Sequence, residues 1–96
     1  MADYKYRASV IIPVYNVEEY LETCLMSMVR QTIDHKDLEV LVINDGSKDG
    51  SLLIAQRFAK EHDFIHVFSK ENEGLSATRN YGIRRAQGRY LFFPGQ

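Results

Sequence analysis

Three polar residues stand at alternating positions in the stretch VINDGSKDGS, residues 42–51. Asp45, Ser47 and Asp49 carry oxygen atoms that can bind a cation or a polar ligand, and an EF-hand calcium loop begins with this spacing. Such a loop needs a bidentate Glu at its twelfth position, where this chain has the neutral amide of Gln56. The residues before the stretch also indicate a strand rather than a helix. A calcium loop is therefore disfavoured, whereas a nucleotide site after a strand and a plain turn before a helix both remain open.

The signals for strands and helices alternate along the chain. Short β-branched apolar runs indicate strands, and apolar residues spaced three and four apart indicate helices. We expect strands at 8–14, 38–43, 64–68 and 90–93, and helices at 17–29, 51–62 and 75–87. Pro13 should end the first strand, Asn16 should cap the first helix, and Gly88 should end the last helix. The order βαβαβαβ predicts an α/β fold, a Rossmann-like three-layer αβα arrangement around a mainly parallel sheet.

Ligands of parallel sheets bind at the carboxyl ends of the strands, so we expect functional residues in the stretches that follow the first three strands. Tyr15 offers a ring on which a base can stack, although it can equally pack against the sheet. Asp45 directly follows a buried strand, and its carboxylate can accept a hydrogen bond from an imide such as the N3–H of uracil. Ser47 and Asp49 are expected to order the turn and cap the next helix.

The stretch 69–76 leads into the last predicted helix, and the free N–H groups of a helix N-terminus bind phosphate well. Ser76 lies in the first turn, and Arg79 follows one turn into the helix, where it can contact a diphosphate or a base carbonyl. The alternative is a surface ion pair between Arg79 and Glu71 or Glu73. Together the stacking ring, the imide acceptor and this anion site suit a nucleoside diphosphate.

The composition indicates one small globular domain of 96 residues, 45% hydrophobic and 26% charged, with a net charge of −1. No apolar run approaches the ~20 residues that span a bilayer. The polar N-terminus gives no sign of a signal peptide. Cys24 is the single cysteine, which excludes an internal disulfide, and its place on an apolar helix face suits a core residue. We expect a cytoplasmic protein with no transmembrane segment and no nucleic-acid partner.

Three ordered segments resemble the start of the family 2 glycosyltransferases, which have the GT-A fold. They read SVIIPVYNVEEYLETCLMSMVRQT, LEVLVINDGSKDGS and NEGLSATRNYGIRRAQGRYLFF, and they cover about residues 8–93. The resemblance implies an enzyme that transfers a sugar from a nucleotide-activated donor, usually with inversion. It also implies that Pro13, Tyr15 and Asp45 contact the base and that Arg79 lies near the base and the diphosphate. A UDP-sugar is the expected donor, although thymine presents the same edge as uracil, and a glycan or lipid-linked glycan is the expected acceptor.

Six residues form the expected substrate-binding set: Pro13, Tyr15, Asn16, Asp45, Ser76 and Arg79. The resemblance implies a divalent metal, Mn²⁺ or Mg²⁺, held by an acidic cluster that follows the fourth strand in the family. Here Gly95 stands where the first acidic residue is expected, and the catalytic base also normally lies further on. Asn44 replaces an Asp often found before the position of Asp45. We therefore expect one domain over 1–96 that stops before the metal-binding motif, has no metal ligands and is inactive alone.

Other nucleotide-binding families fit less well. The first loop lacks the glycines of a nucleotidyltransferase, and neither a dinucleotide-binding G-x-G-x-x-G motif nor a P-loop is present. The alternative is a nucleotide-binding or interaction fragment with no chemistry of its own. An exposed fourth strand would also favour pairing with a second copy, so a homodimer is a further hypothesis.

Overall fold

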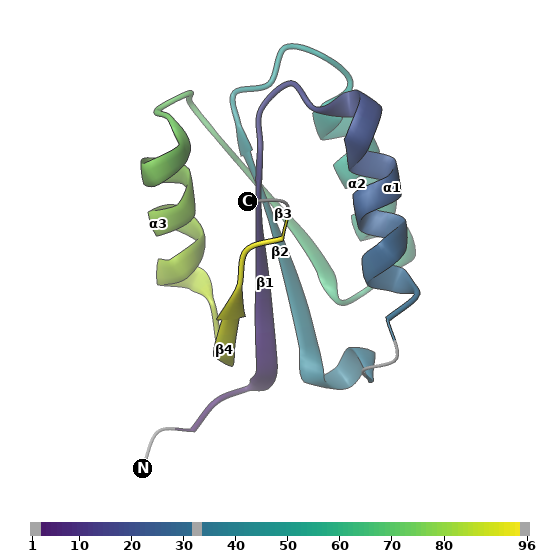
Figure 1. The fold of residues 1–96 in the computed structure, drawn as a ribbon, viewed down its shortest axis with the longest axis vertical. Coiled ribbons are helices and arrows are strands. Elements are labelled where there is room, and N and C mark those ends of the chain that lie inside the picture. Colours follow the sequence, from purple (N-terminus) through teal and green to yellow (C-terminus); the bar gives the residue numbers. More distant parts are fainter. Residues whose placement is uncertain (1–2, 32–33, 95–96) are drawn as a thin grey trace.

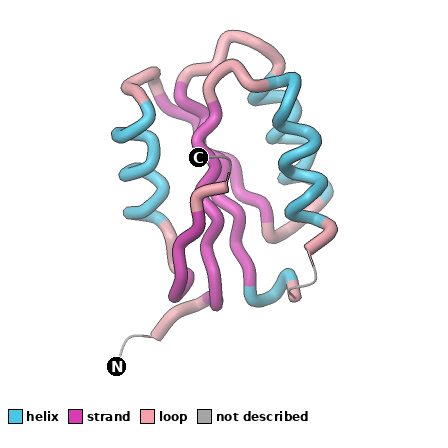
Figure 2. The backbone as a smooth tube through the Cα atoms, viewed as in Figure 1, coloured by secondary structure: helices cyan, strands magenta, loops and turns pink. Residues whose placement is uncertain are grey.

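The computed structural model describes residues 3–31 and 34–94, which form a parallel four-stranded sheet between two helical layers (Figure 1). The elements in chain order are β1 (Tyr6–Val14), α1 (Glu18–Val29), the 3-10 helix η1 (His35–Asp37), β2 (Leu38–Asp45), α2 (Ser51–Glu61), β3 (Ile65–Lys70), α3 (Leu75–Arg85) and β4 (Gly88–Phe92). The strand order is β3-β2-β1-β4, and every pairing is parallel. Helices α1 and α2 cover one face and α3 covers the other (Figure 2). The predicted α/β three-layer fold is confirmed.

The central strand β2 explains why its sequence is apolar without alternation. All eight of its residues are buried, because β1 and β3 flank it and helices cover both of its faces. On the α1 and α2 face, Val10 and Val42 pack with Leu25 and Phe58. The α3 face has a smaller core built on three buried residues: Ile11, Leu41 and Ile43.

Helix α3 lies very close to the sheet at Gly82. A Cβ atom at this position would stand 2.5 Å from Cγ2 of Ile11, so a larger residue would push the helix away. Gly88 has a similar role at the start of β4, where a Cβ would stand 2.5 Å from the hydroxyl of Ser9. The prediction that Gly88 ends the last helix is therefore wrong. α3 ends at Arg85, and Gly88 allows β4 to lie against β1.

Pro13 lies inside β1 and does not end it. The β1–β4 pairing runs only as far as Val10, so on that side the last part of β1 has no neighbouring strand. A proline is tolerated there because the backbone N–H that it lacks would have no strand to donate to on that side. On the other side Pro13 still pairs in register with Ile43 of β2.

A buried carboxylate, Glu39, joins β2 to the start of β4. Glu39 is 4% exposed, and its Oε2 accepts hydrogen bonds from the Ser9 hydroxyl and from the N–H of Gln87. The Ser9 Oγ in turn accepts the N–H of Gly88 at 2.8 Å. These bonds satisfy the carboxylate and fix the position at which β4 enters the sheet.

Candidate functional site

The loops that follow β1, β2 and β3 meet at one end of the sheet, uppermost in Figure 1. We call loops 15–17, 46–50 and 71–74 the loop rim. The rim lies at the carboxyl ends of the strands, where ligands of parallel sheets bind. The chain passes from β1 to β2 through α1 on one face and from β3 to β4 through α3 on the other. The topological switch point therefore lies between β1 and β4.

Asn16 joins the first loop of the rim to the second. Its backbone N–H donates to Oγ of Ser47 at 3.0 Å, and its Oδ1 accepts the N–H of Lys48 at 2.8 Å. Asn16 has a positive φ of 52°, a conformation that Asn tolerates better than most residues. Asn16 was expected to cap α1, and this expectation is wrong. The N-cap position is Val17, and no side chain of the first loop caps the helix.

The caps of α1 come instead from residues more than 30 positions away. The N–H of Val17 donates to Oγ of Ser51 at 2.9 Å, and that of Glu18 donates to Oδ2 of Asp49 at 3.2 Å. Glu18 returns a bond, because its carboxylate accepts the N–H of Gly50 at 3.0 Å. Asp49 also accepts the N–H of Ser51 at 2.9 Å, so one carboxylate serves the starts of both α1 and α2. This agrees with the capping role predicted for Asp49.

Asp45 joins the second loop of the rim to the third. The residue is 4% exposed, and its Oδ1 accepts a hydrogen bond from Nζ of Lys70 and another from the N–H of Glu73, each at 2.8 Å. Its Oδ2 accepts the N–H of Gly74 at 3.0 Å. Its backbone carbonyl accepts a bond from Nδ2 of Asn72 at 3.0 Å. Asp45 therefore fixes the backbone that leads into α3.

The Asp45–Lys70 pair is buried on both sides, with exposed side-chain fractions of 5% and 8%. Burial raises the pKa of the Asp45 carboxyl, but the hydrogen bonds from Lys70, Glu73 and Gly74 together hold it below its ordinary value. Burial likewise lowers the pKa of the Lys70 ammonium, and its bonds to Asp45 and Glu73 outweigh this and raise it. Both groups therefore stay charged at neutral pH.

Gly46 allows the second and third loops to touch. Its φ is 71°, in the region that favours glycine, and a Cβ would stand 2.9 Å from the backbone nitrogen of Asn72. The contact brings the polypeptide of loop 71–74 directly over the end of β2. Gly74, with a φ of 96°, then starts α3, and no side chain caps that helix.

Arg79 and Ser76 lie on α3 close to this uncapped N-terminus. Ser76 is exposed in the first turn, and Arg79 is partly buried one turn further on. The predicted alternative, an ion pair from Arg79 to Glu71 or Glu73, is absent, and Glu73 contacts Lys70 at 2.9 Å instead. Among the described residues, Nε of Arg79 is buried without a hydrogen-bond partner.

Tyr15 and Pro13 stand at the switch point. The Tyr15 side chain is 47% exposed at the end of β1, so its ring is free to contact a ligand and is not part of the core. On the other side of the switch point, the guanidinium of Arg79 lies 5.9 Å from the ring centre of Phe93. The structure thus places the expected residues along one end of the sheet, with Asp45 one strand away from Tyr15.

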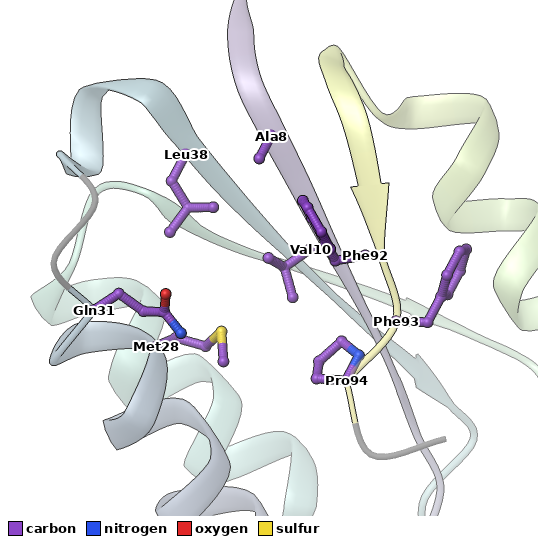
Figure 3. A pocket seen from close by; sticks show the side chains of 8 residues that line it. All are labelled: Ala8, Val10, Met28, Gln31, Leu38, Phe92, Phe93 and Pro94. Carbon is purple, nitrogen blue, oxygen red and sulfur yellow. The ribbon is translucent and has the colours of Figure 1, made fainter.

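A separate apolar hollow of about 390 Å³ lies away from the rim, on the α1 side of β1 and β4 (Figure 3). Ala8, Val10, Met28 and Leu38 line it together with the ring of Phe92. Figure 3 shows Phe93 turned to the opposite side of its strand, toward α3. The sequence patterns gave no sign of this hollow, because its lining residues come from β1, α1, β2 and β4.

The described residues do not fit a divalent metal. Within 3–31 and 34–94, no group of three or more His, Cys, Asp or Glu side chains can hold a metal ion. Three carboxylates at this end of the sheet already accept N–H groups, namely those of Asp45, Asp49 and Glu18. Over the same residues, no helix combines the length and the apolar character needed to cross a bilayer.

The layered sheet, with polar loops at the carboxyl ends of its strands, defines a Rossmann-like α/β domain of the kind that binds nucleotides. The chain belongs to glycosyltransferase family 2, because the model of that family, described as glycosyl transferase family 2, matches residues 9–94. The family match confirms the resemblance noted from the sequence. It also confirms that the chain is a glycosyltransferase by family resemblance.

Relatives of known name are similar across nearly the whole chain. A cholesterol galactosyltransferase of Borreliella burgdorferi is 46% identical over 90 residues, which are 94% of this chain and 25% of that protein. The glycosyltransferase GlyA of Streptococcus pneumoniae is 45% identical over 87 residues, 91% of this chain and 12% of that protein. The chain thus spans a quarter or less of the length of these relatives.

Solved GT-A enzymes have the same fold. The S. aureus protein TarS, residues 1–349 in complex with UDP-GlcNAc, superimposes with a TM-score of 0.84 at 30% identity, covering 91% of this chain and 25% of that one. The mannosyltransferase PcManGT of Pyrobaculum calidifontis, in complex with GDP-Man and Mn²⁺, gives 0.83 at 28% identity, covering 92% and 26%. The two neighbours carry different bases, uracil and guanine.

Sequence reasoning missed Lys70 as part of the site. No local pattern in the sequence ties Lys70 to Asp45. The pairing register does so, since Asp45 and Lys70 are partners at the ends of β2 and β3. An acidic and a basic residue that each follow an apolar run by one or two positions are the signal that could have found the pair.

Proposed function

We propose that this chain is the donor-nucleotide half of an inverting glycosyltransferase that uses a nucleoside diphosphate sugar, with UDP as the nucleotide. The observation that carries the proposal is Nε of Arg79, which has no hydrogen-bond partner among the described residues and is buried one turn from the uncapped N-terminus of α3. A buried guanidinium N–H without an acceptor is costly, and a diphosphate at this position would satisfy it.

Each expected residue has a role in this proposal. The exposed ring of Tyr15 stacks on the base, and Asp45 accepts the imide N–H. The first-turn N–H groups of α3, the hydroxyl of Ser76 and the guanidinium of Arg79 receive the diphosphate. Pro13 and Asn16 act on the shape of the first loop, Pro13 through its fixed φ and Asn16 through its bonds to the second loop.

The same groups would assist the transfer step. In a single inverting displacement, the acceptor hydroxyl attacks the anomeric carbon, and the bond to the diphosphate oxygen breaks as negative charge develops there. The hydroxyl proton passes to a catalytic base, which the family resemblance places outside the described residues. Arg79 and the α3 N-terminus stand where they would stabilise this charge. We place the acceptor hydroxyl on a glycan or lipid-linked glycan, in the wider setting of polysaccharide synthesis. The family's divalent metal would draw its ligands from outside the described residues.

The second candidate function is nucleotide binding without chemistry. It is favoured by the carboxylates of Glu18, Asp49 and Asp45, which already accept N–H groups and are therefore poorly placed to act as a base for an acceptor hydroxyl. The purified 96-residue chain is accordingly expected to show no sugar transfer. Transfer to any acceptor by this chain, with a UDP-sugar and Mg²⁺, would contradict that expectation and reject the second candidate.

An NMR titration of amide shifts tests the nucleotide site directly. UDP, GDP, CDP and AMP are added to the labelled chain, with and without diamagnetic Mg²⁺. UDP should shift the amides near Tyr15, Asp45 and Arg79, and Mg²⁺ should add little. A folded chain whose amides respond to none of the four nucleotides would reject the proposed function.

A further inference from the structure

We propose that Lys70 is a specificity-determining residue, which selects a base edge with a single N–H donor by occupying one oxygen of Asp45. The inference rests on the proposed function, since it concerns the base that this nucleotide site accepts. Lys70 acts through Asp45 and is therefore a positioning residue rather than a direct contact to the base. Its effect is to favour uracil or thymine over guanine.

The argument begins with the acceptor capacity of the Asp45 carboxylate. An ionised carboxylate offers about four lone-pair sites on its two oxygens. Oδ1 receives Nζ of Lys70 and the N–H of Glu73, so both of its sites are used. Within the part of the chain that the structure describes, Oδ2 receives only the N–H of Gly74, which leaves a single acceptor site on Asp45 for a ligand.

The bonds of Lys70 show that it stays on Asp45. A lysine ammonium has three N–H donors, and all three have acceptors here. They are Oδ1 of Asp45 at 2.8 Å, the carbonyl of Glu71 at 2.8 Å and Oε1 of Glu73 at 2.9 Å. Pairing between β2 and β3 sets Lys70 directly beside Asp45, and its side chain is only 8% exposed.

The bases differ in how many adjacent N–H donors they present. Uracil and thymine present one imide N–H between two carbonyl oxygens, which the free site on Oδ2 satisfies. Guanine presents N1–H and the 2-amino group side by side, and a carboxylate binds such a pair with both oxygens. Because Oδ1 is already filled, the second guanine donor would lose its water without gaining an acceptor. The fold itself does not decide the base, since its solved neighbours hold UDP-GlcNAc in one case and GDP-Man in the other.

Three nucleotides test the inference on the unmodified chain by isothermal titration calorimetry. UDP should bind most tightly, and IDP, which is GDP without the 2-amino group, should bind at least as tightly as GDP. IDP binding about tenfold more weakly than GDP would overturn the inference, because it would mean that both oxygens of Asp45 receive guanine. Equal affinities for UDP and GDP would also overturn it.

A variant extends the test to Lys70 itself. Lys70→Met frees one of the two acceptor sites on Oδ1, so the preference for UDP over GDP should fall about tenfold, which corresponds to about 1.4 kcal/mol. Lys60→Met is the matched control, since it removes the same charge from an exposed position on α2 and should leave the preference unchanged. If Lys70 were only structural, Lys70→Met would weaken the binding of UDP and of GDP equally. An unchanged ratio of the two affinities in folded Lys70→Met would therefore refute the role of Lys70 in selecting the base.

The outcomes separate this inference from the proposed function. A folded chain that binds none of UDP, GDP and IDP rejects the nucleotide site, and the role of Lys70 with it. A chain that binds nucleotides with no preference among the bases keeps the nucleoside diphosphate site, but loses the assignment of UDP and this inference. If Lys70→Met does not fold, the comparison of IDP with GDP on the unmodified chain decides the question alone.

Discussion

The loop rim and the outer side of β4 are both borders of the same sheet, yet they are built in opposite ways. At the rim, backbone N–H groups donate to side-chain oxygens of neighbouring segments, and Asp45 is only 4% exposed. Along β4, Tyr90 and Phe92 are 52% and 53% exposed, and Leu91 is 40% exposed. The rim is therefore held in one shape by polar bonds, whereas the β4 border leaves apolar surface uncovered.

The difference indicates where rigidity matters in this domain. Under the proposed function, the rim binds a nucleotide and needs groups that are fixed before the ligand arrives, so that little ordering cost falls on binding. The β4 border has no such requirement, and it is attached to the sheet by β1 on one side alone. Substitutions at the rim should accordingly change the stability of the fold and the binding of a ligand. Substitutions at β4 should instead change the association of the chain with a second copy.

The largest expected effect follows from Asp45→Ala. The change leaves Lys70 buried without its carboxylate and frees the N–H groups of Glu73 and Gly74. We expect a loss of about 3 kcal/mol in the free energy of unfolding, measured by urea denaturation. Asp63→Ala, at an exposed position, should stay within about 0.5 kcal/mol of the unmodified chain. A loss for Asp45→Ala as small as that of this control would mean that the rim is not held by the carboxylate.

Acidification should weaken the rim through the same residue. The folded pKa of Asp45 lies below its unfolded value, so its contribution is complete above the unfolded value and is lost as pH falls toward the folded one. Lys70 has the opposite sign, because its pKa is raised and its contribution is lost only as pH rises through the folded value. Unfolding curves from neutral to acid pH should therefore show a decline that is shallower in Asp45→Asn. Equal slopes for the two chains would contradict this assignment.

A smaller effect is expected at Asn16. Asn16→Ala removes the acceptor for the N–H of Lys48 and places a Cβ-bearing residue without a polar side chain at a φ of 52°. The expected loss is about 1–2 kcal/mol by urea denaturation. Asn16→Gly removes the same hydrogen bond but tolerates the backbone, so it should cost less than Asn16→Ala. The reverse order would show that the positive φ is not strained.

The smallest effect on stability is expected at the β4 border. Phe92→Lys replaces an exposed ring with a charged side chain, so the free energy of unfolding should change by less than about 1 kcal/mol. Its effect should appear in association instead. We expect the unmodified chain to self-associate through β4, and Phe92→Lys to be monomeric, in sedimentation velocity. A monomeric unmodified chain would dismiss the homodimer.

Most of the fold could be predicted because apolar runs and helical spacings are local properties. The predicted ends were wrong where distant contacts decide them. The second strand was expected to stop at 43, but β2 continues to Asp45, and β3 continues to Lys70, because these two residues pair with each other. Asn is a common N-cap residue and Asn16 stands just before α1, yet the caps of α1 come from Asp49 and Ser51, far along the chain.

The position of the candidate site residues was predictable, but their connections were not. The rule that ligands bind at the carboxyl ends of parallel strands predicts that Tyr15 and Asp45 lie at one end of the sheet, where the structure places both, with Arg79 in the first turns of α3. It says nothing of which oxygen of Asp45 is free, because that depends on the backbone of loop 71–74 and on Lys70. The same limit applies to the predicted ion pair of Arg79 with Glu71 or Glu73, because the sequence does not show that the Glu73 side chain contacts Lys70.

The buried carboxylate of Glu39 has a consequence for how the chain is made. Its acceptor Oε2 and the hydroxyl of Ser9 are completed by the N–H groups of Gln87 and Gly88, almost at the opposite end of the sequence. During synthesis, β1 and β2 leave the ribosome long before these donors exist. The carboxyl group of Glu39 thus cannot be closed off from water until Gln87 and Gly88 have been synthesised, so this sheet completes its folding only after β4 has been translated.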